Sequence, residues 1–164
     1  MTDELASSLA TGPHAVLGAL VGDWAGLTRT WFRPGDLADE SATAGTVRPV
    51  LAGRFVVHEY AGTLMDEAME GVATLGFDIA ENRFVCAWVD SVHTGTAVML
   101  SVGEPGATDT ISVLGAYDAG DGSQWGWRTT VVQPSHDELV VSHFNIPAGA
   151  DEYLGVETRY RRVD

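Results

Sequence analysis

The chain has 164 residues, of which 45% are hydrophobic and 20% are charged, a composition that excludes wholesale disorder. Its formal net charge of −14 would repel nucleic-acid phosphates and anionic membrane surfaces, so neither is expected as a partner. All nine basic residues are arginines, which removes Schiff-base chemistry, a phosphate-binding lysine and a lysine general base.

The N-terminal part of the chain predicts an arm and one helix. Residues 1–12 are small and polar and are expected to form a flexible arm, whose acidic start lacks the positive charge of a secretory signal. No apolar run approaches the ~20 residues needed to cross a bilayer, so we expect a cytoplasmic protein. Pro13 to Val21 predicts a short helix, because Val16, Leu17 and Leu20 share one face. A helix this short is expected to be a plug or lid.

From Trp24 onward the sequence is rich in Val, Thr, Phe, Tyr and Trp, which is typical of strands. Turn sequences such as Arg-Pro-Gly-Asp at 33–36 and Asp-Ala-Gly-Asp-Gly at 118–122 separate the segments, and no helical pattern lies between them. The predicted strands span 24–33, 42–51, 54–61, 68–78, 83–90, 96–103, 110–117, 125–133, 138–146 and 153–162.

Ten strands with short connections predict an antiparallel meander, and closure into a barrel removes the exposed sheet edges. We therefore predict an all-β fold, a closed antiparallel up-and-down β-barrel of about ten strands with one short N-terminal helix. Residues 13–164 form this single domain. A barrel of this size has room inside for a small ligand.

Several short sequences resemble those of calycin-type barrels. Leu-Val-Gly-Asp-Trp-Ala-Gly at 20–26 resembles their Gly-x-Trp opening, in which a tryptophan of the first strand packs across one barrel end. The further matches, in order, are Leu-Ala-Gly-Arg-Phe (51–55), Leu-Gly-Phe-Asp (75–78), Ala-Trp-Val-Asp-Ser (87–91), Trp-Arg-Thr (127–129) and Arg-Tyr-Arg-Arg (159–162).

Together these sequences resemble the bacterial family known as domain of unknown function 1579, from about residue 15 to the end. The resemblance implies an architecture like that of lipocalins, fatty-acid-binding proteins and the haem-binding nitrobindins, and it brings no established activity. Phe77 departs from the tyrosine expected before Asp78, which removes a hydroxyl group from that turn.

Side chains of one parity on each strand point into a barrel, so parity decides which polar groups meet inside it. On segment 83–90, Phe84, Cys86, Trp88 and Asp90 share a face that predicts a core side ending in a carboxylate near the barrel mouth. We expect Asp90 to accept hydrogen bonds from turn amides or to pair with an arginine, in preference to a ligand or catalytic role. Cys86, the only cysteine, is expected to be an unreactive core thiol.

On segment 54–61, Arg54, His58 and Tyr60 share a face, but the opposite face is about as apolar, so both orientations stay open. Arg128 and Glu157 can form a cross-barrel ion pair that orients a polar ligand, because burying such a pair brings little net stability. The candidate ligand-binding residues are Trp24, Arg54, His58, Tyr60, Phe84, Trp88, Asp90, Trp127, Arg128, His143 and Glu157.

Other clusters give weaker signals. The five histidines show no metal-binding spacing, so no metal site is expected. Asp90, Ser91 and His93 are close in sequence, which is not triad geometry, and turn capping explains Asp90-Ser91 better. The terminal arginines, which alternate as a strand would, are expected on a solvated strand face; they are Arg159, Arg161 and Arg162.

The leading hypothesis is noncatalytic binding or carriage of a small, mostly apolar or amphipathic molecule inside the barrel. The first alternative is a small isomerase or hydrolase that uses His58 or Asp90 as its base. The second is a haem-binding barrel with His143 as the axial ligand, although no cofactor is required. The third is a partner-binding domain whose interior is packed solid, and a homodimer also stays open.

Overall fold

Most strands of this protein bury alternate side chains over much of their length. Strand β5 (Arg83–Asp90) shows the pattern without a break, because Phe84, Cys86, Trp88 and Asp90 are buried and the residues between them are partly exposed. An antiparallel sheet with one apolar face has to cover that face, and a sheet that closes on itself does so without a second layer.

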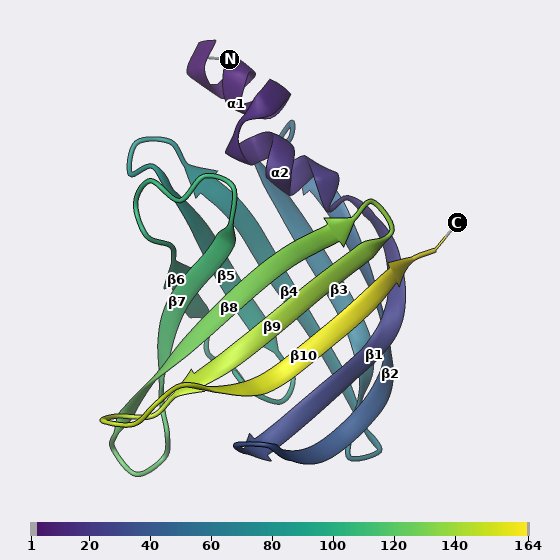
Figure 1. Cartoon of the computed structure of the whole chain (residues 1–164), viewed down its shortest axis with the longest axis vertical. Coiled ribbons are helices and arrows are strands. Elements are labelled where there is room, and N and C mark those ends of the chain that lie inside the picture. The colour runs from purple at the N-terminus through teal and green to yellow at the C-terminus, as the bar shows by residue number, and fades with distance from the viewer. Residues whose placement is uncertain (1–2, 164) are drawn as a thin grey trace.

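The computed structural model describes residues 3–163, and its ten strands form a closed antiparallel barrel (Figure 1). Each strand pairs with its neighbours in the chain, and β1 pairs with β10 to complete the ring. The remaining strands are β1 (Gly22–Arg33), β2 (Asp36–Val50), β3 (Phe55–Leu64), β4 (Glu67–Asp78), β6 (Met99–Val102), β7 (Ile111–Asp118), β8 (Gln124–Ser135), β9 (Glu138–Ile146) and β10 (Tyr153–Arg162).

The predicted closed barrel is therefore confirmed, and most strands begin and end close to the predicted positions. Two strands differ in length. Strand β2 begins at Asp36 and so includes a polar stretch, Ala38–Ser41, that lacks a strand composition but pairs with the end of β1. Strand β6 is shorter than the predicted segment 96–103 because residues 91–98 form a loop.

The seam between β1 and β10 depends on a glycine. Gly26 lies opposite Tyr160, and a Cβ atom at position 26 would lie 1.9 Å from the backbone carbonyl oxygen of Arg159. Beside this contact, the hydroxyl oxygens of Thr28 and Thr158 are 2.8 Å apart and hydrogen-bond across the seam. A side chain at position 26 would force the two closing strands apart.

Two helices, α1 (Asp3–Thr11) and α2 (Pro13–Ala19), lie at one end of the barrel in the described chain (Figure 1). The predicted short helix is confirmed as α2, whose Leu17 is fully buried in the core. Residues 3–11 differ from the expected flexible arm. They form a helix because Leu5 finds a buried position and two acidic residues occupy the first turn, where they complement the helix dipole.

Trp24 and Arg162 close the barrel at this helical end. The buried indole of Trp24 donates a hydrogen bond from Nε1 to the carbonyl oxygen of Leu20, 3.0 Å away. The guanidinium of Arg162 lies 4.2 Å above the same indole and donates to the carbonyl oxygens of Ala19 and Val21. These bonds satisfy carbonyl groups at the end of α2 and attach the helix to the last strand.

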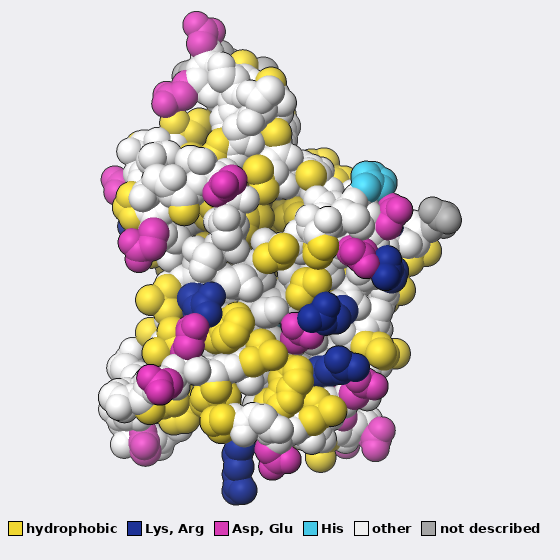
Figure 2. Space-filling model, viewed as in Figure 1, with side chains coloured by type: hydrophobic (Ala, Val, Ile, Leu, Met, Phe, Trp, Pro, Cys, Tyr) yellow, Lys and Arg dark blue, Asp and Glu magenta, His cyan; other side chains and the backbone are white. Residues whose placement is uncertain are grey.

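The outer surface carries both signs of charge, with arginines placed among hydrophobic side chains on the face seen in Figure 2. Arg159 and Arg161 lie on this solvated outside, as expected, and pair with Glu157 and Glu138. The same expectation is wrong for Arg162, because the last inward-facing position of β10 turns its side chain over the barrel end. Among residues 3–163, no helix is long and apolar enough to span a membrane.

Replacing Gly26 tests the seam. We expect Gly26→Ala to lower the free energy of unfolding by about 3 kcal/mol, because the new Cβ meets backbone that no side-chain rotation can move. Gly18→Ala is the matched control: nothing lies within 4 Å of the added Cβ, and alanine favours the helix by about 0.5–1 kcal/mol. Urea unfolding followed by tryptophan fluorescence measures both variants. Equal stability of Gly26→Ala and the parent protein would contradict the role of this glycine.

Candidate ligand-binding site

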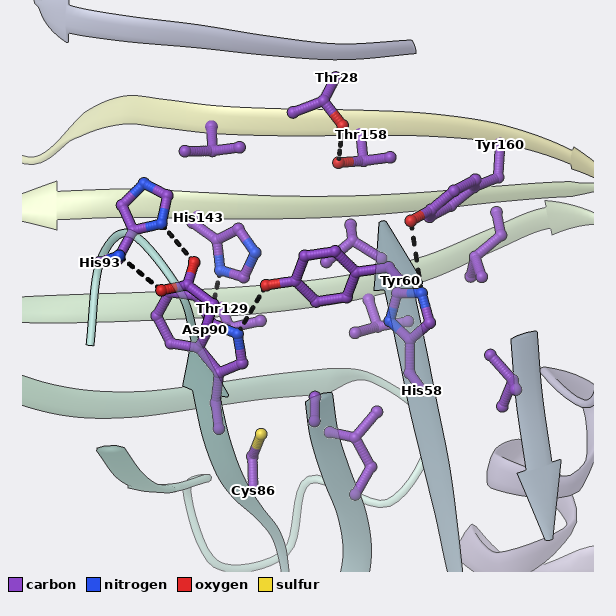
Figure 3. A pocket seen from close by; sticks show the side chains of 18 of the residues that line it. Thr28, His58, Tyr60, Cys86, Asp90, His93, Thr129, His143, Thr158 and Tyr160 are labelled. Carbon is purple, nitrogen blue, oxygen red and sulfur yellow. Dashed lines mark hydrogen bonds and ion pairs between the residues drawn. The ribbon is translucent and has the colours of Figure 1, made fainter. Parts of the chain in front are cut away.

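The barrel encloses a chamber of about 60 Å³ near its middle, which is room for a few water molecules. Inward-facing side chains from most of the strands line it, and Figure 3 shows the polar ones. Six of the residues predicted from the sequence face this chamber: His58, Tyr60, Trp88, Asp90, Trp127 and His143. The open question about segment 54–61 is thereby decided, since His58 and Tyr60 both point inward.

At the helical end of the chamber, two aromatic residues surround His58. Its Nε2 atom lies 3.3 Å from the hydroxyl oxygen of Tyr160, and its ring centroid lies 5.2 Å from that of Tyr60 (Figure 3). Burial lowers the pKa of His58 to about 4 and raises the pKa of Tyr160 to about 12. Both groups are therefore uncharged at neutral pH.

Tyr60 spans the middle of the chamber. Its hydroxyl oxygen accepts a hydrogen bond from Nε1 of Trp88 at 2.9 Å, and burial raises the pKa of this phenol. The opposite residue on β4 is Gly71, where a Cβ atom would lie 2.3 Å from the Tyr60 hydroxyl. The glycine therefore leaves the space that the tyrosine ring occupies.

The rings of Trp88, Trp127 and His143 are stacked pairwise, with their planes within 24° of one another. The two indole centroids are 5.5 Å apart, and each lies 5.3 Å from the imidazole centroid of His143. Nδ1 of His143 is 2.9 Å from the hydroxyl oxygen of Thr129, and burial lowers the pKa of His143 to about 3. Both indoles pack against this imidazole, and the chamber is far smaller than usual ligand pockets of ~300–1,000 Å³.

Asp90 organises the end of the barrel opposite the helices. Its Oδ1 atom accepts hydrogen bonds from the backbone N–H groups of Val92, His93 and Thr94, which confirms the predicted bonds to turn amides. Its Oδ2 atom lies 2.5 Å from Nδ1 of His93. Burial works against the carboxylate, but the hydrogen bonds from His93 and the loop amides outweigh it and lower the pKa of Asp90.

A second hollow, here called the vestibule, lies at the same end and has a volume of about 230 Å³. Aromatic residues dominate its lining, which includes Trp31, Phe32, Tyr117, Trp125 and Tyr153. Trp88, His93, Trp127 and Val156 line both the vestibule and the chamber, and the three aromatic residues among them are here called the partition between the two spaces. The mouth of the barrel is therefore the end opposite the helices.

One buried donor of the partition has no partner. Among the buried side-chain polar atoms of residues 3–163, only Nε of Arg83 and Nε1 of Trp127 lack a hydrogen bond. Nearly all buried donors in folded proteins are paired, so an unpaired one in a residue that lines a cavity calls for an acceptor. Trp127 is 5% exposed and faces both hollows.

Comparison with known proteins agrees with this architecture. A model of the family described as "Protein of unknown function (DUF1579)" matches residues 10–162. The chain belongs to this family. Among solved structures, the S-type phycobiliprotein lyase CPES of Guillardia theta is similar with a TM-score of 0.61 over 100% of this chain and 99% of that chain. At 13% identity the likeness shows a shared fold. A comparison with curated proteins gave no match.

Three of the predicted ligand-binding residues lie near the helical end of the barrel instead of in the chamber. Trp24 seals the barrel beneath α2, as the resemblance implied, and so is not part of the chamber wall. Phe84 is fully buried and packs edge-on against Phe77. Arg54 is exposed in the turn before β3 and donates to the carbonyl oxygen of Leu51.

The expected cross-barrel pair of Arg128 and Glu157 is wrong. Arg128 lies on the outer face, pairs with Glu152 and covers the ring of Phe144. Glu157 pairs with Arg159 on the outside as well. Arg128 faces out because its neighbour Trp127 on β8 faces in. Glu157 faces out because a bulge in β10, between residues 154 and 156, shifts the parity of that strand.

The same bulge hides two inward-facing residues that sequence analysis missed, Thr158 and Tyr160. Sequence analysis named His93 beside Asp90 without giving it a place in the site, since it lies in a loop where strand parity carries no information. Within residues 3–163, no group of three or more His, Cys, Asp or Glu side chains is placed to hold a metal ion. Cys86 is buried in the chamber wall, and burial raises its thiol pKa to about 12.

The buried neutral histidines predict a pH dependence of stability. In the unfolded chain His58 and His143 become protonated below pH ~6.5. In the folded protein burial lowers the pKa to about 4 for His58 and to about 3 for His143. The free energy of unfolding therefore does not depend on these two histidines above pH ~6.5. Below that pH it falls by up to ~1.4 kcal/mol per pH unit for each histidine.

We expect His143→Phe, which keeps a ring in the stack, to reduce this slope by up to ~1.4 kcal/mol per pH unit between about pH 6 and 4.5. His136→Phe is the control and leaves the slope unchanged, because the His136 side chain is 80% exposed. Urea unfolding at several pH values measures the slope. The same slope in His143→Phe as in the parent protein would show that His143 takes up protons freely in the folded state.

Proposed function

We propose that this protein binds a small, mostly apolar molecule that carries one hydrogen-bond acceptor. The molecule enters at the end opposite the helices and lies in the vestibule against the partition of Trp88, His93 and Trp127. The observation that carries this proposal is the buried, unpaired indole N–H of Trp127, a residue that lines the aromatic hollow. Burying the acceptor of a ligand there satisfies a donor that otherwise has no partner.

The sizes of the hollows limit the ligand. The vestibule of about 230 Å³ and the chamber of about 60 Å³ together approach the lower end of the ~300–1,000 Å³ that ligand pockets span. The interior is therefore not packed solid, and it suits a small molecule better than a long chain or a haem. Phe32, 58% exposed at the rim, supplies apolar surface that a bound molecule would cover.

The polarity of the lining favours an uncharged ligand. No arginine of the described chain lines either hollow, since Arg54 and Arg128 lie elsewhere. The carboxylate of Asp90 is fully engaged by the loop and by His93. An ion inside the barrel would lose its hydration without gaining a partner of opposite charge, whereas a carbonyl oxygen finds the Trp127 donor.

The similar solved structure supports the barrel as a scaffold, and its name describes that protein as a phycobiliprotein lyase. A shared fold does not carry an activity or a substrate from one protein to another, so the proposal stands on the residues of the site.

The experiment compares two fluorescent naphthalenes, of which only one carries a propionyl group with its carbonyl oxygen. We expect 6-propionyl-2-dimethylaminonaphthalene, which has one carbonyl oxygen, to bind the purified protein with a blue-shifted emission. Trp127→Phe keeps an aromatic ring but removes the N–H donor, so it should weaken this binding about 2- to 10-fold, the worth of one hydrogen bond. N,N-dimethyl-2-naphthylamine lacks the acceptor and is the control: its affinity should be the same for both proteins.

Two outcomes oppose the proposal. If neither naphthalene binds the parent protein at its solubility limit, the proposed ligand class is wrong. If Trp127→Phe lowers the affinity for both naphthalenes equally, the indole ring contributes through its shape and the assigned hydrogen bond is absent.

A further inference from the structure

The loop 91–98 places one ring in the barrel mouth that simple ligand binding does not explain. The centroid of His93 lies 5.7 Å from Trp88 and 5.7 Å from Trp127, so the imidazole lies beside both indoles of the partition. Capping the turn does not require this arrangement, because Oδ1 of Asp90 alone accepts the three loop N–H groups.

The second carboxylate oxygen of Asp90, Oδ2, contacts His93. The Asp90 side chain is 1% exposed and its Oδ2 atom bonds to Nδ1 of the imidazole. A carboxylate at Nδ1 keeps the proton on that nitrogen and leaves the lone pair on Nε2. Nε2 faces away from Asp90 (Figure 3), and the His93 side chain, 24% exposed, lines both hollows. The geometry is that of an oriented base beside a cavity.

The other two histidines of the chamber are not placed for this role. His58 lies at the helical end, where its Nε2 atom contacts the hydroxyl of Tyr160. His143 is buried within the ring stack and bonded to Thr129. Asp90 itself has both oxygens engaged, so it orients a base and does not act as one. These placements differ from the enzyme alternative considered from the sequence, which used His58 or Asp90.

The surroundings of His93 define the class of reaction. Within residues 3–163, no serine, threonine or cysteine side chain hydrogen-bonds to the His93 ring, so the pair lacks the nucleophile of a triad. What remains is proton transfer to and from the ligand. The unpaired Trp127 N–H adds a donor that can stabilise negative charge developing on an oxygen atom.

We propose that His93, oriented by Asp90, is a general base for an enolisable ketone held against the partition; this rests on the binding function proposed above. Nε2 takes a proton from the carbon next to the carbonyl, and the electrons of that C–H bond form the C=C bond of an enolate. The oxygen gains the negative charge and accepts the Trp127 N–H, while Asp90 stabilises the imidazolium. His93 then returns the proton to carbon, so no oxidant, reductant or leaving group takes part.

The test uses 4-phenylbutan-2-one in deuterium oxide. Exchange of its protons next to the carbonyl is followed by ¹H NMR, and binding is followed in the same samples by saturation-transfer difference signals. We expect the parent protein to exchange these protons about 10²-fold faster than His93→Asn, the lower range of general-base catalysis. His93→Asn suits the test because its side-chain amide can still donate to Asp90 and hold the loop. His136→Asn, at an exposed site, should keep the parent rate.

The outcomes separate the two proposals. Binding without exchange above the buffer rate, or equal exchange by the parent and His93→Asn proteins, would reject the role of His93 and leave the binding function intact. Absence of saturation transfer from the parent protein to this ketone would reject the binding function, and the role of His93 with it. Loss of exchange with retained binding in His93→Asn supports both.

Discussion

The pairing of β1 with β10 is the constraint on which the other features of this protein depend. It closes the sheet, and closure turns one set of side chains from every strand toward a common axis. Gly26 permits the close approach of the two strands, and the bond between Thr28 and Thr158 lies across the same seam. On an open sheet, His58 of β3 and Tyr160 of β10 would be remote, whereas here they are 3.3 Å apart.

Closure gives the barrel two chemically different ends. At the helical end, Arg162 covers Trp24 and bonds to the carbonyl groups at the end of α2, so this end is sealed. At the other end, aromatic side chains surround a hollow, and Asp90 holds a loop that carries His93 into it. Between the ends, His58 contacts Tyr160 and Tyr60 bonds to Trp88, while Nε1 of Trp127 is, among the chamber-lining residues described, the fully buried donor left without a partner. Local contacts at the two ends thus decide which end of the barrel is open and which polar groups face the hollow there.

Strand positions and six inward-facing candidates could be predicted because β-strands alternate and turns carry recognisable residues, as Trp88 and Asp90 show on β5. Two kinds of information were missing. A bulge at Gly155 changes parity, and a glycine within a strand does not by itself establish a bulge, so Tyr160 was missed and Glu157 was put on the wrong side. A loop has no parity at all, so the inward position of His93 depends on hydrogen bonds to Asp90 that only a three-dimensional structure reveals.

The most direct measurement of where a ligand lies uses the five tryptophans of the chain. Each indole N–H gives its own signal in a ¹H–¹⁵N NMR spectrum, and two of these residues mark the opposite ends of the barrel. On titration with 6-propionyl-2-dimethylaminonaphthalene, we predict that the signal of Trp127 shifts most and that the signal of Trp24, sealed beneath α2, stays in place. A shift of the Trp24 signal with an unmoved Trp127 signal would place the ligand at the helical end of the barrel and contradict a binding site in the vestibule.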